Sequence, residues 1–289
     1  RVRTPSSGSP RVGALWTRLS HVGVGGNDRL VTMQVGEISQ LWRFPVKSMR
    51  GDRVVSTEVT ERWGFPGDRG WALRDEESGR ITNAKKLTSL LQFHARYLEE
   101  PVGDGAPPVE ITAPGGRTVR SDDDDNDVAA VLSAAAGRRV TLWPRHSPGS
   151  DAPHRHGRLS EAGAGDTYFD ASPLSLATTT ALGSLQDAIP DSAIDPRRFR
   201  TNIIVSTDCG PGEFPEFDWV GRRLVLGDVV CEVTVRIPRC VMVGLPQAEL
   251  PHDSSVLKTL AARTGMDFAV YLRVVEPGRI SEGDPVRLD

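Results

Sequence analysis

The stretch Val35-Gly-Glu-Ile-Ser-Gln-Leu-Trp-Arg-Phe-Pro-Val-Lys-Ser48 decides the fold. Its first part mixes apolar and polar residues with a short period, which predicts a half-buried β-strand over Val35–Arg43. Phe44-Pro45 then leads into a turn that brings a cation and a hydroxyl, Lys47 and Ser48, to one strand end. Such a corner suits an oxyanion such as phosphate, although both residues also fit an ordinary surface.

Short strands separated by turn signals continue along the rest of the chain. We expect them at residues 54–60, 71–74, 80–83, 93–98, 109–113, 118–120, 200–206, 224–226, 229–236 and 268–275. Helices are expected at residues 128–136, 181–188 and 255–264, and a final turn at 278–284. The aspartates before the first helix fit a negatively charged helix start better than a calcium loop. This pattern predicts a mostly β protein with a few helices, an α+β barrel or sandwich rather than a parallel α/β sheet.

The composition is that of a soluble globular protein, with 38% hydrophobic and 25% charged residues and a net charge of −3. This balance argues against nucleic acid or an acidic membrane as a partner, and no run approaches the ~20 apolar residues that span a bilayer. Cys209, Cys231 and Cys240 form no CxxC pair, which argues against a disulfide scaffold, a zinc ribbon or an iron–sulfur cluster on this chain. The expected location is the cytoplasm. His154 and His156 are interpreted as loop residues rather than metal ligands.

The first 34 residues are rich in Ser, Gly and Arg and contain no methionine before Met33. They fit either an organelle-directing leader or an extension upstream of a true start at Met33. We favour the second interpretation and expect this segment to be disordered.

Cys240 directly follows Arg239 at the end of a strand-like run. Positive charge beside a thiol favours the thiolate, which attacks electrophiles or ligates soft metals. The alternative is a small buried hydrophobic residue, which is the commoner role of a lone cysteine.

Four further polar residues are candidates for an anion site. Arg69 lies in a glycine-flanked turn, and Thr178 at the start of a helix, where free amides favour an anion. Arg200 and Asn202 alternate on an expected strand, so we expect both side chains on one face. Each has a structural explanation when taken singly. Together they indicate an anion site near a cysteine.

These segments resemble the MOSC proteins, named for the C-terminal domain of molybdenum cofactor sulfurase. The resemblance rests on residues 41–48, Gly51, 67–71, 75–82, 172–174, 198–205, Trp219, Gly227, 238–240 and 278–286. It implies an N-terminal β-barrel domain at residues 35–145, a connector at 146–165 and a MOSC β-barrel domain at 166–289, with the two barrels packed together. Residues 1–34 lie outside both.

Within that family the sequence is most similar to the amidoxime-reducing component and its bacterial relatives. This resemblance implies a molybdenum cofactor in its molybdopterin form and reduction of the N–OH bond of N-hydroxylated compounds by oxygen transfer to molybdenum. Electrons would come from a separate ferredoxin, flavin or haem protein. Cys240 would ligate molybdenum beside Arg239, and the pterin and its phosphate would be held by Lys47, Ser48, Arg69, Thr178, Arg200 and Asn202.

Two other functions remain open. A MOSC module could carry sulfur as a Cys240 persulfide, or handle the cofactor without turnover. A substrate-binding barrel without metal would leave Cys240 as a core residue.

Overall fold

The computed structural model describes residues 33–145, 168–207 and 214–289. The expected disordered extension therefore lies outside the described residues except for Met33 and Gln34. The connector at 146–165 with His154 and His156, and also Cys209, lie outside them as well.

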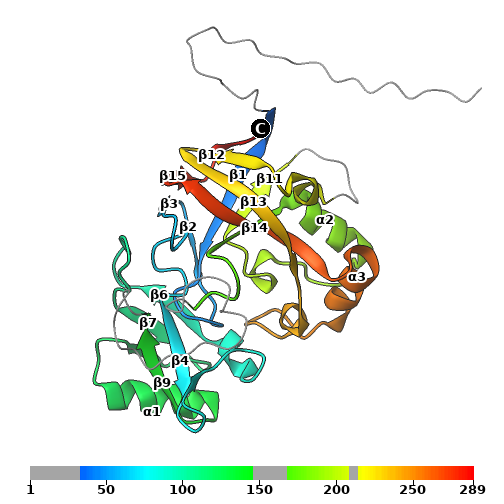
Figure 1. Cartoon of the computed structure of the whole chain (residues 1–289). Coiled ribbons are helices and arrows are strands. Elements are labelled where there is room, and N and C mark those ends of the chain that lie inside the picture. The colour runs from blue at the N-terminus through cyan, green and yellow to red at the C-terminus, as the bar shows by residue number, and fades with distance from the viewer. Residues whose placement is uncertain (1–32, 146–167, 208–213) are drawn as a thin grey trace, which may run out of the picture. The chain divides into compact units, whose positions relative to one another are not determined.

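Seven strands form a closed β-barrel (Figure 1). In order around the barrel they are β1 (Met33–Arg43), β11 (Ile203–Ser206), β10 (Leu174–Thr178), β14 (Asp267–Glu276), β13 (Val229–Pro238), β12 (Arg223–Leu226) and β16 (Pro285–Leu288). The first strand of the described residues closes the ring, because β1 pairs antiparallel with both β11 and β16. β2 (Asp52–Val54) adds to β1 outside the ring.

The barrel is stabilised by apolar side chains from every strand, which fill its interior. Leu41, Leu176 and Ile203 are fully buried in one core cluster with Val233 and Leu272. One position of β1, Gly36, leaves no space for a side chain. A Cβ added at Gly36 would lie 2.0 Å from the Ser206 carbonyl oxygen, so glycine is what lets β1 approach β11.

The remainder of the first half forms smaller sheets with their own core. One sheet has the order β5 (Arg80–Ile81), β4 (Trp71–Asp75), β9 (Val140–Pro144), and another β6 (His94–Tyr97), β7 (Val109–Thr112), β8 (Thr118–Arg120). The 3₁₀ helix η1 (Thr88–Gln92) and helix α1 (Asp125–Ala136) accompany them. Asp124 caps α1 by accepting from the Asn126 amide, and Gly137 ends it at φ 69°.

Helices α2 (Thr179–Ala188) and α3 (Ser254–Thr264) lie beside the barrel, and their apolar faces share a third core cluster. Three 3₁₀ turns connect this region: η3 (Pro196–Arg198), η4 (Pro215–Trp219) and η5 (Val241–Gly244). The expected α+β fold, mostly strand with few helices, is confirmed. None of the helices in the described residues is long and apolar enough to cross a membrane.

Two sequence predictions of local structure were wrong. Residues 278–284 are not only a turn, because β15 (Gly278–Ser281) pairs with β3 (Ser56–Val59). The strand expected from residue 200 begins at Ile203, and Arg200 has a φ of 53°. Arg200 and Asn202 therefore do not alternate on a strand. They lie in the turn that precedes it.

Candidate functional site

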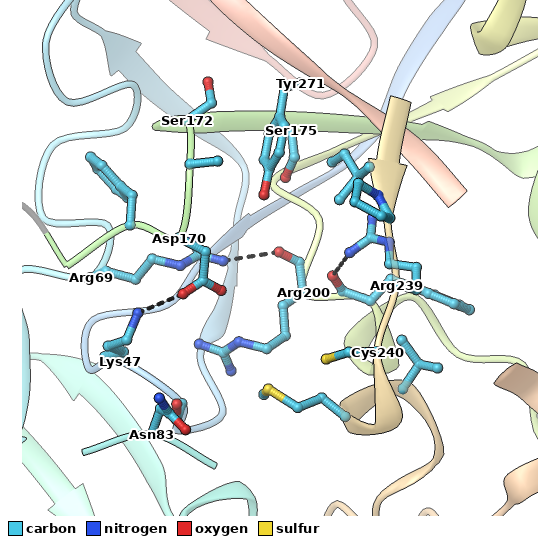
Figure 2. A pocket seen from close by; sticks show the side chains of 18 of the residues that line it. Lys47, Arg69, Asn83, Asp170, Ser172, Ser175, Arg200, Arg239, Cys240 and Tyr271 are labelled. Atoms are coloured by element: carbon cyan, nitrogen blue, oxygen red, sulfur yellow. Dashed lines mark hydrogen bonds and ion pairs between the residues drawn. The ribbon is translucent and has the colours of Figure 1, made fainter. Parts of the chain in front are cut away.

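A cavity of about 630 Å³ lies where loops of the first half meet the ends of barrel strands (Figure 2). The first half contributes the turn after β1 and the segments around Arg69 and Asn83. The barrel contributes the segment before β10, the turn before β11 and the end of β13. Of the predicted site residues, the cavity brings together Lys47, Ser48, Arg69, Arg200, Asn202, Arg239 and Cys240.

Lys47 forms an ion pair across the cavity with Asp170. Its Nζ donates to Asp170 Oδ1 at 2.8 Å and to the Tyr168 carbonyl at 2.7 Å. Burial lowers the pKa of Lys47, and the charge of Asp170 opposes this. Burial alone would raise the pKa of Asp170, but Lys47, with Arg69 and Arg200, lowers it to about 2. Asp170 is therefore ionised at neutral pH.

Three residues of the cavity wall have left-handed backbone conformations that are uncommon for side chains other than glycine. These are Ser48 (φ 66°), Arg69 (φ 49°) and Arg200 (φ 53°). Such conformations cost of order 1–3 kcal/mol each and concentrate at ligand sites. Here they turn two guanidiniums onto the buried ring of Phe44, with centroid distances of 5.0 Å for Arg69 and 4.3 Å for Arg200. Arg69 also donates to the Arg200 carbonyl at 3.2 Å.

Arg200 and Arg239 each keep one buried guanidinium nitrogen, Nη2, without a hydrogen-bond partner. Arg200 Nη1 donates to the Met49 carbonyl, and Arg239 donates to the Phe268 and Phe199 carbonyls at 2.8 and 2.9 Å. Burial, with nearby positive charge, lowers the pKa of Arg200 to about 9, and burial lowers that of Arg239 to about 10. Both remain cations at neutral pH. Unpartnered buried donors are costly, so these two atoms indicate an anionic or acceptor ligand.

Cys240 lies where β13 ends and η5 begins. The Arg239 amide donates to the Met266 carbonyl at 2.8 Å and the Val243 amide to the Cys240 carbonyl at 3.2 Å, so both sides of the residue are fixed. The thiol does not cap η5 and forms no disulfide, and it lines the cavity (Figure 2). Cys231 differs: it is fully buried in the barrel core, and burial raises its pKa to about 12.

Asn202 and Thr178 have different surroundings. Asn202 lines the cavity, and its side chain accepts from Ser175 Oγ at 3.0 Å and donates to the Trp42 carbonyl at 3.2 Å. Thr178 is not at the cavity wall. It caps α2 and donates to Glu216 at 2.8 Å, so the hydroxyl at this helix start is already bonded to a carboxyl group of the protein itself.

Sequence reasoning missed several residues of the wall. The principal ones are Asn83, Lys85, Asp170, Ser172, Ser175 and Tyr271. Ser172 belonged to a segment used for the family resemblance, which was a usable signal. Asp170 and Asn83 lie outside regular strands, where periodicity carries no information.

The donor set of the cavity limits what metal site it can form. Among the described residues there is no group of three or more His, Cys, Asp and Glu side chains that could hold a metal ion. Cys240 alone can offer a soft thiolate, so a metal here would bring its other ligands with it. A molybdenum ion carried by a phosphorylated pterin dithiolate meets that requirement, and its negative charge matches the unpartnered Arg200 and Arg239 nitrogens.

Two family models match the chain: the MOSC N-terminal beta barrel domain over residues 35–154 and the MOSC domain over residues 156–287. The chain belongs to the MOSC proteins. Mitochondrial amidoxime-reducing component 1 of Mus musculus is 26% identical over 88% of this MOSC protein and 83% of the mouse protein. The Homo sapiens protein of the same name is 25% identical over 90% of this chain and 85% of the human protein. Among solved structures, the YUAD protein of Bacillus subtilis aligns with 89% of this chain and 98% of its own at 11% identity and a TM-score of 0.45.

Proposed function

We propose that this MOSC protein binds a molybdenum cofactor of the molybdopterin type in the cavity and reduces N-hydroxylated compounds. One observation carries the proposal: Arg200 and Arg239, each with a buried guanidinium nitrogen that has no partner, line the same cavity as Cys240, whose thiol is free. An anionic ligand satisfies the first feature and a soft metal the second. The similarity to amidoxime-reducing components supports the choice of reaction.

In this proposal three cations hold the pterin and its phosphate: Lys47 in the turn after β1, Arg69 in the turn before β4 and Arg200 in the turn before β11. Ser48 and Asn202 line the same cavity and would contribute to this binding. Arg239 screens negative charge near the metal, and Cys240 contributes the protein thiolate. Thr178 makes no direct contact, because it is committed to Glu216.

The bound cofactor would supply the two-electron chemistry that breaks the N–O bond. The substrate R–N–OH takes up two electrons and two protons, and its oxygen leaves as water. A separate ferredoxin, flavin or haem protein of the cytoplasm is the proposed electron source. The protein's own task is to orient the substrate beside Cys240 and to hold the cofactor's charge in place.

The test is production in a host that makes the cofactor, followed by molybdenum analysis, pterin fluorescence and reduction of benzamidoxime with dithionite-reduced methyl viologen. Cys240→Ala is expected to abolish turnover, whereas Cys231→Ala, a change outside the cavity, keeps molybdenum and activity. Wild-type protein without molybdenum or pterin would contradict the proposal. Release of sulfide from Cys240 in such a preparation would favour the sulfur-carrier function instead.

A further inference from the structure

We propose that Arg198 is a positioning residue for Cys240. Its buried guanidinium holds the main chain of the turn that begins at the thiol, and it thereby fixes where the sulfur lies in the cavity. The inference rests on the proposed function, in which that thiolate binds the metal. It adds a residue that acts on the site through the backbone of another segment.

Arg198 ends η3 and is one of the largest side chains that are fully buried. Nε donates to the Ala193 carbonyl at 2.8 Å and Nη2 to the Pro251 carbonyl at 3.0 Å. Nη1 reaches the turn of η5, where it donates to the Val243 carbonyl at 3.3 Å and the Leu245 carbonyl at 3.5 Å. Although Arg198 lies at the cavity wall, all three nitrogens are therefore used within the protein.

The choice of arginine at this buried position indicates a task that needs its donors. Burying a guanidinium is costly unless its N–H groups are satisfied. Among the described residues Arg198 donates to no carboxylate, although Asp253 and Asp195 act on it through their charge. An apolar side chain would avoid the cost but would leave four carbonyls without this donor. The planar fork of donors suits a residue that ties separate loops together.

The contact with η5 leads directly to Cys240. The Val243 carbonyl accepts from Arg198, and the Val243 amide donates to the Cys240 carbonyl at 3.2 Å. Two hydrogen bonds through one residue thus join the guanidinium to the main chain of the cysteine. The same turn packs closely on the segment before α3, because a Cβ added at Gly244 would lie 2.5 Å from the Asp253 carbonyl oxygen.

Arg239 holds the other side of the thiol in the opposite direction. It directly precedes Cys240, and its Nη1 donates at 2.9 Å to the carbonyl of Phe199, the residue after Arg198. Arg239 therefore holds the segment of Arg198, while Arg198 holds the segment that follows Cys240. These two opposed contacts set the Cys240 turn against the turn of Arg200, which lines the same cavity (Figure 2).

Removing Arg198 should affect the thiol more than the anion site. The Arg200 turn keeps contacts of its own, because the Arg200 carbonyl accepts from Arg69 and the Arg200 Nη1 donates to the Met49 carbonyl. The Cys240 turn loses the donor to two of its carbonyls. A variant at Arg198 is therefore expected to retain pterin and to lose the correct placement of Cys240.

Hydrogen exchange of the cofactor-free protein tests this without turnover. Arg198→Met keeps a long side chain but removes all of its donors. The amides of Val243 and Leu245 should exchange about 10- to 100-fold faster than in wild type, because the turn loses charge-assisted hydrogen bonds. Arg263→Met is the matched control, since Arg263 also donates to a main-chain carbonyl, that of Ser184 at 3.0 Å, but lies outside the cavity.

Two results of this exchange experiment would overturn the proposal. One is unchanged exchange of the Val243 and Leu245 amides in Arg198→Met. The other is an equal acceleration in Arg263→Met, because the turn would then follow only the stability of the whole protein. Arg198→Lys keeps the charge without the fork and should accelerate exchange by about 3- to 10-fold. If Arg198→Met does not fold, Arg198→Lys decides by the same criteria.

The cofactor-loaded protein provides the second readout. In Arg198→Met, kcat for benzamidoxime with reduced methyl viologen should fall at least about 10-fold, because a small displacement of the thiol is enough. The pterin-to-protein ratio should stay within about 3-fold of wild type, and Arg198→Lys should recover part of kcat. An unchanged kcat, or a parallel loss of pterin, would refute the positioning role. Wild-type protein without molybdenum and pterin would refute the proposed function, and hydrogen exchange then decides separately whether Arg198 holds the turn.

Discussion

Replacing Glu216 with glutamine will change how the stability of this protein depends on pH. Glu216 is fully buried in η4 and accepts a hydrogen bond from Thr178 Oγ1 at 2.8 Å, while its Oε1 has no partner. Burial raises the pKa of this carboxyl to about 7, against the hydrogen bonds from Thr178 that favour its ionised form. The folded protein therefore retains a proton that the unfolded chain releases.

The size of the effect follows from the two pKa values. An ordinary glutamate, as in the unfolded chain, ionises near 4.5, and Glu216 in the folded protein near 7. The stabilisation is fully present below pH 4.5 and is lost as the pH rises through 7, because the folded state must then hold a buried charge. At about 1.4 kcal/mol per pKa unit, the change amounts to about 3 kcal/mol.

Urea unfolding at several pH values between 4.5 and about 8.5 measures this directly. Glutamine keeps an acceptor for Thr178 but does not titrate. The free energy of unfolding of Glu216→Gln, relative to wild type, should rise by about 3 kcal/mol across this range. A fixed cost of the buried amide cancels, because only the change with pH is compared. The exposed Glu100→Gln should give a change below about 1 kcal/mol. A flat difference for Glu216→Gln would refute the reasoning.

Three further predictions test the fold and the cavity, and the first has a control substitution. Gly36→Ala forces a Cβ against the Ser206 carbonyl and should lower the free energy of unfolding by at least about 3 kcal/mol in the same urea experiment. Gly183→Ala is the control: it lies at an exposed site of α2 with open space around it, and it should raise the free energy of unfolding by up to about 1 kcal/mol. Phe44→Leu removes the ring under two guanidiniums and should cost about 2 kcal/mol of stability and reduce the pterin-to-protein ratio. Lys47→Met removes a cation of the cavity wall and should lower pterin retention about 10-fold or more; unchanged retention would contradict the anion site.

Several of the strands that the sequence predicted alternate between a buried face and a more exposed face. β7 alternates between buried and half-buried residues, and residues 109–113 were assigned correctly. β10 was missed because all five of its residues are buried, so no period of two is visible. The last strand, β16, was missed as well, and four residues give little pattern to read.

For the cavity, the sequence predicted residues whose chemistry is visible without geometry. A thiol beside an arginine, and a lysine with a serine after a strand, are such signals. The left-handed conformation of Arg200 is not visible in the sequence, because nothing in an arginine side chain demands a positive φ. Tertiary contacts impose it: the Arg200 carbonyl accepts from Arg69, and its guanidinium lies over Phe44. Asp170 likewise could not be predicted from its own segment, because its partner in the cavity, Lys47, lies more than a hundred residues earlier in the chain.

The strand pairing that closes the barrel also sets the geometry of the cavity. β1 pairs with β11 at Leu41 and Ile203, and the Trp42 amide donates to the Asn202 carbonyl at 2.8 Å. The turn after β1 carries Lys47, and the turn before β11 carries Arg200, so the pairing of these two strands sets the spacing of the two cations. A substitution that opens the ring, even at the far end of β1, would therefore separate them. In the proposed anion site, the barrel would contribute through its register as well as through the side chains that it presents.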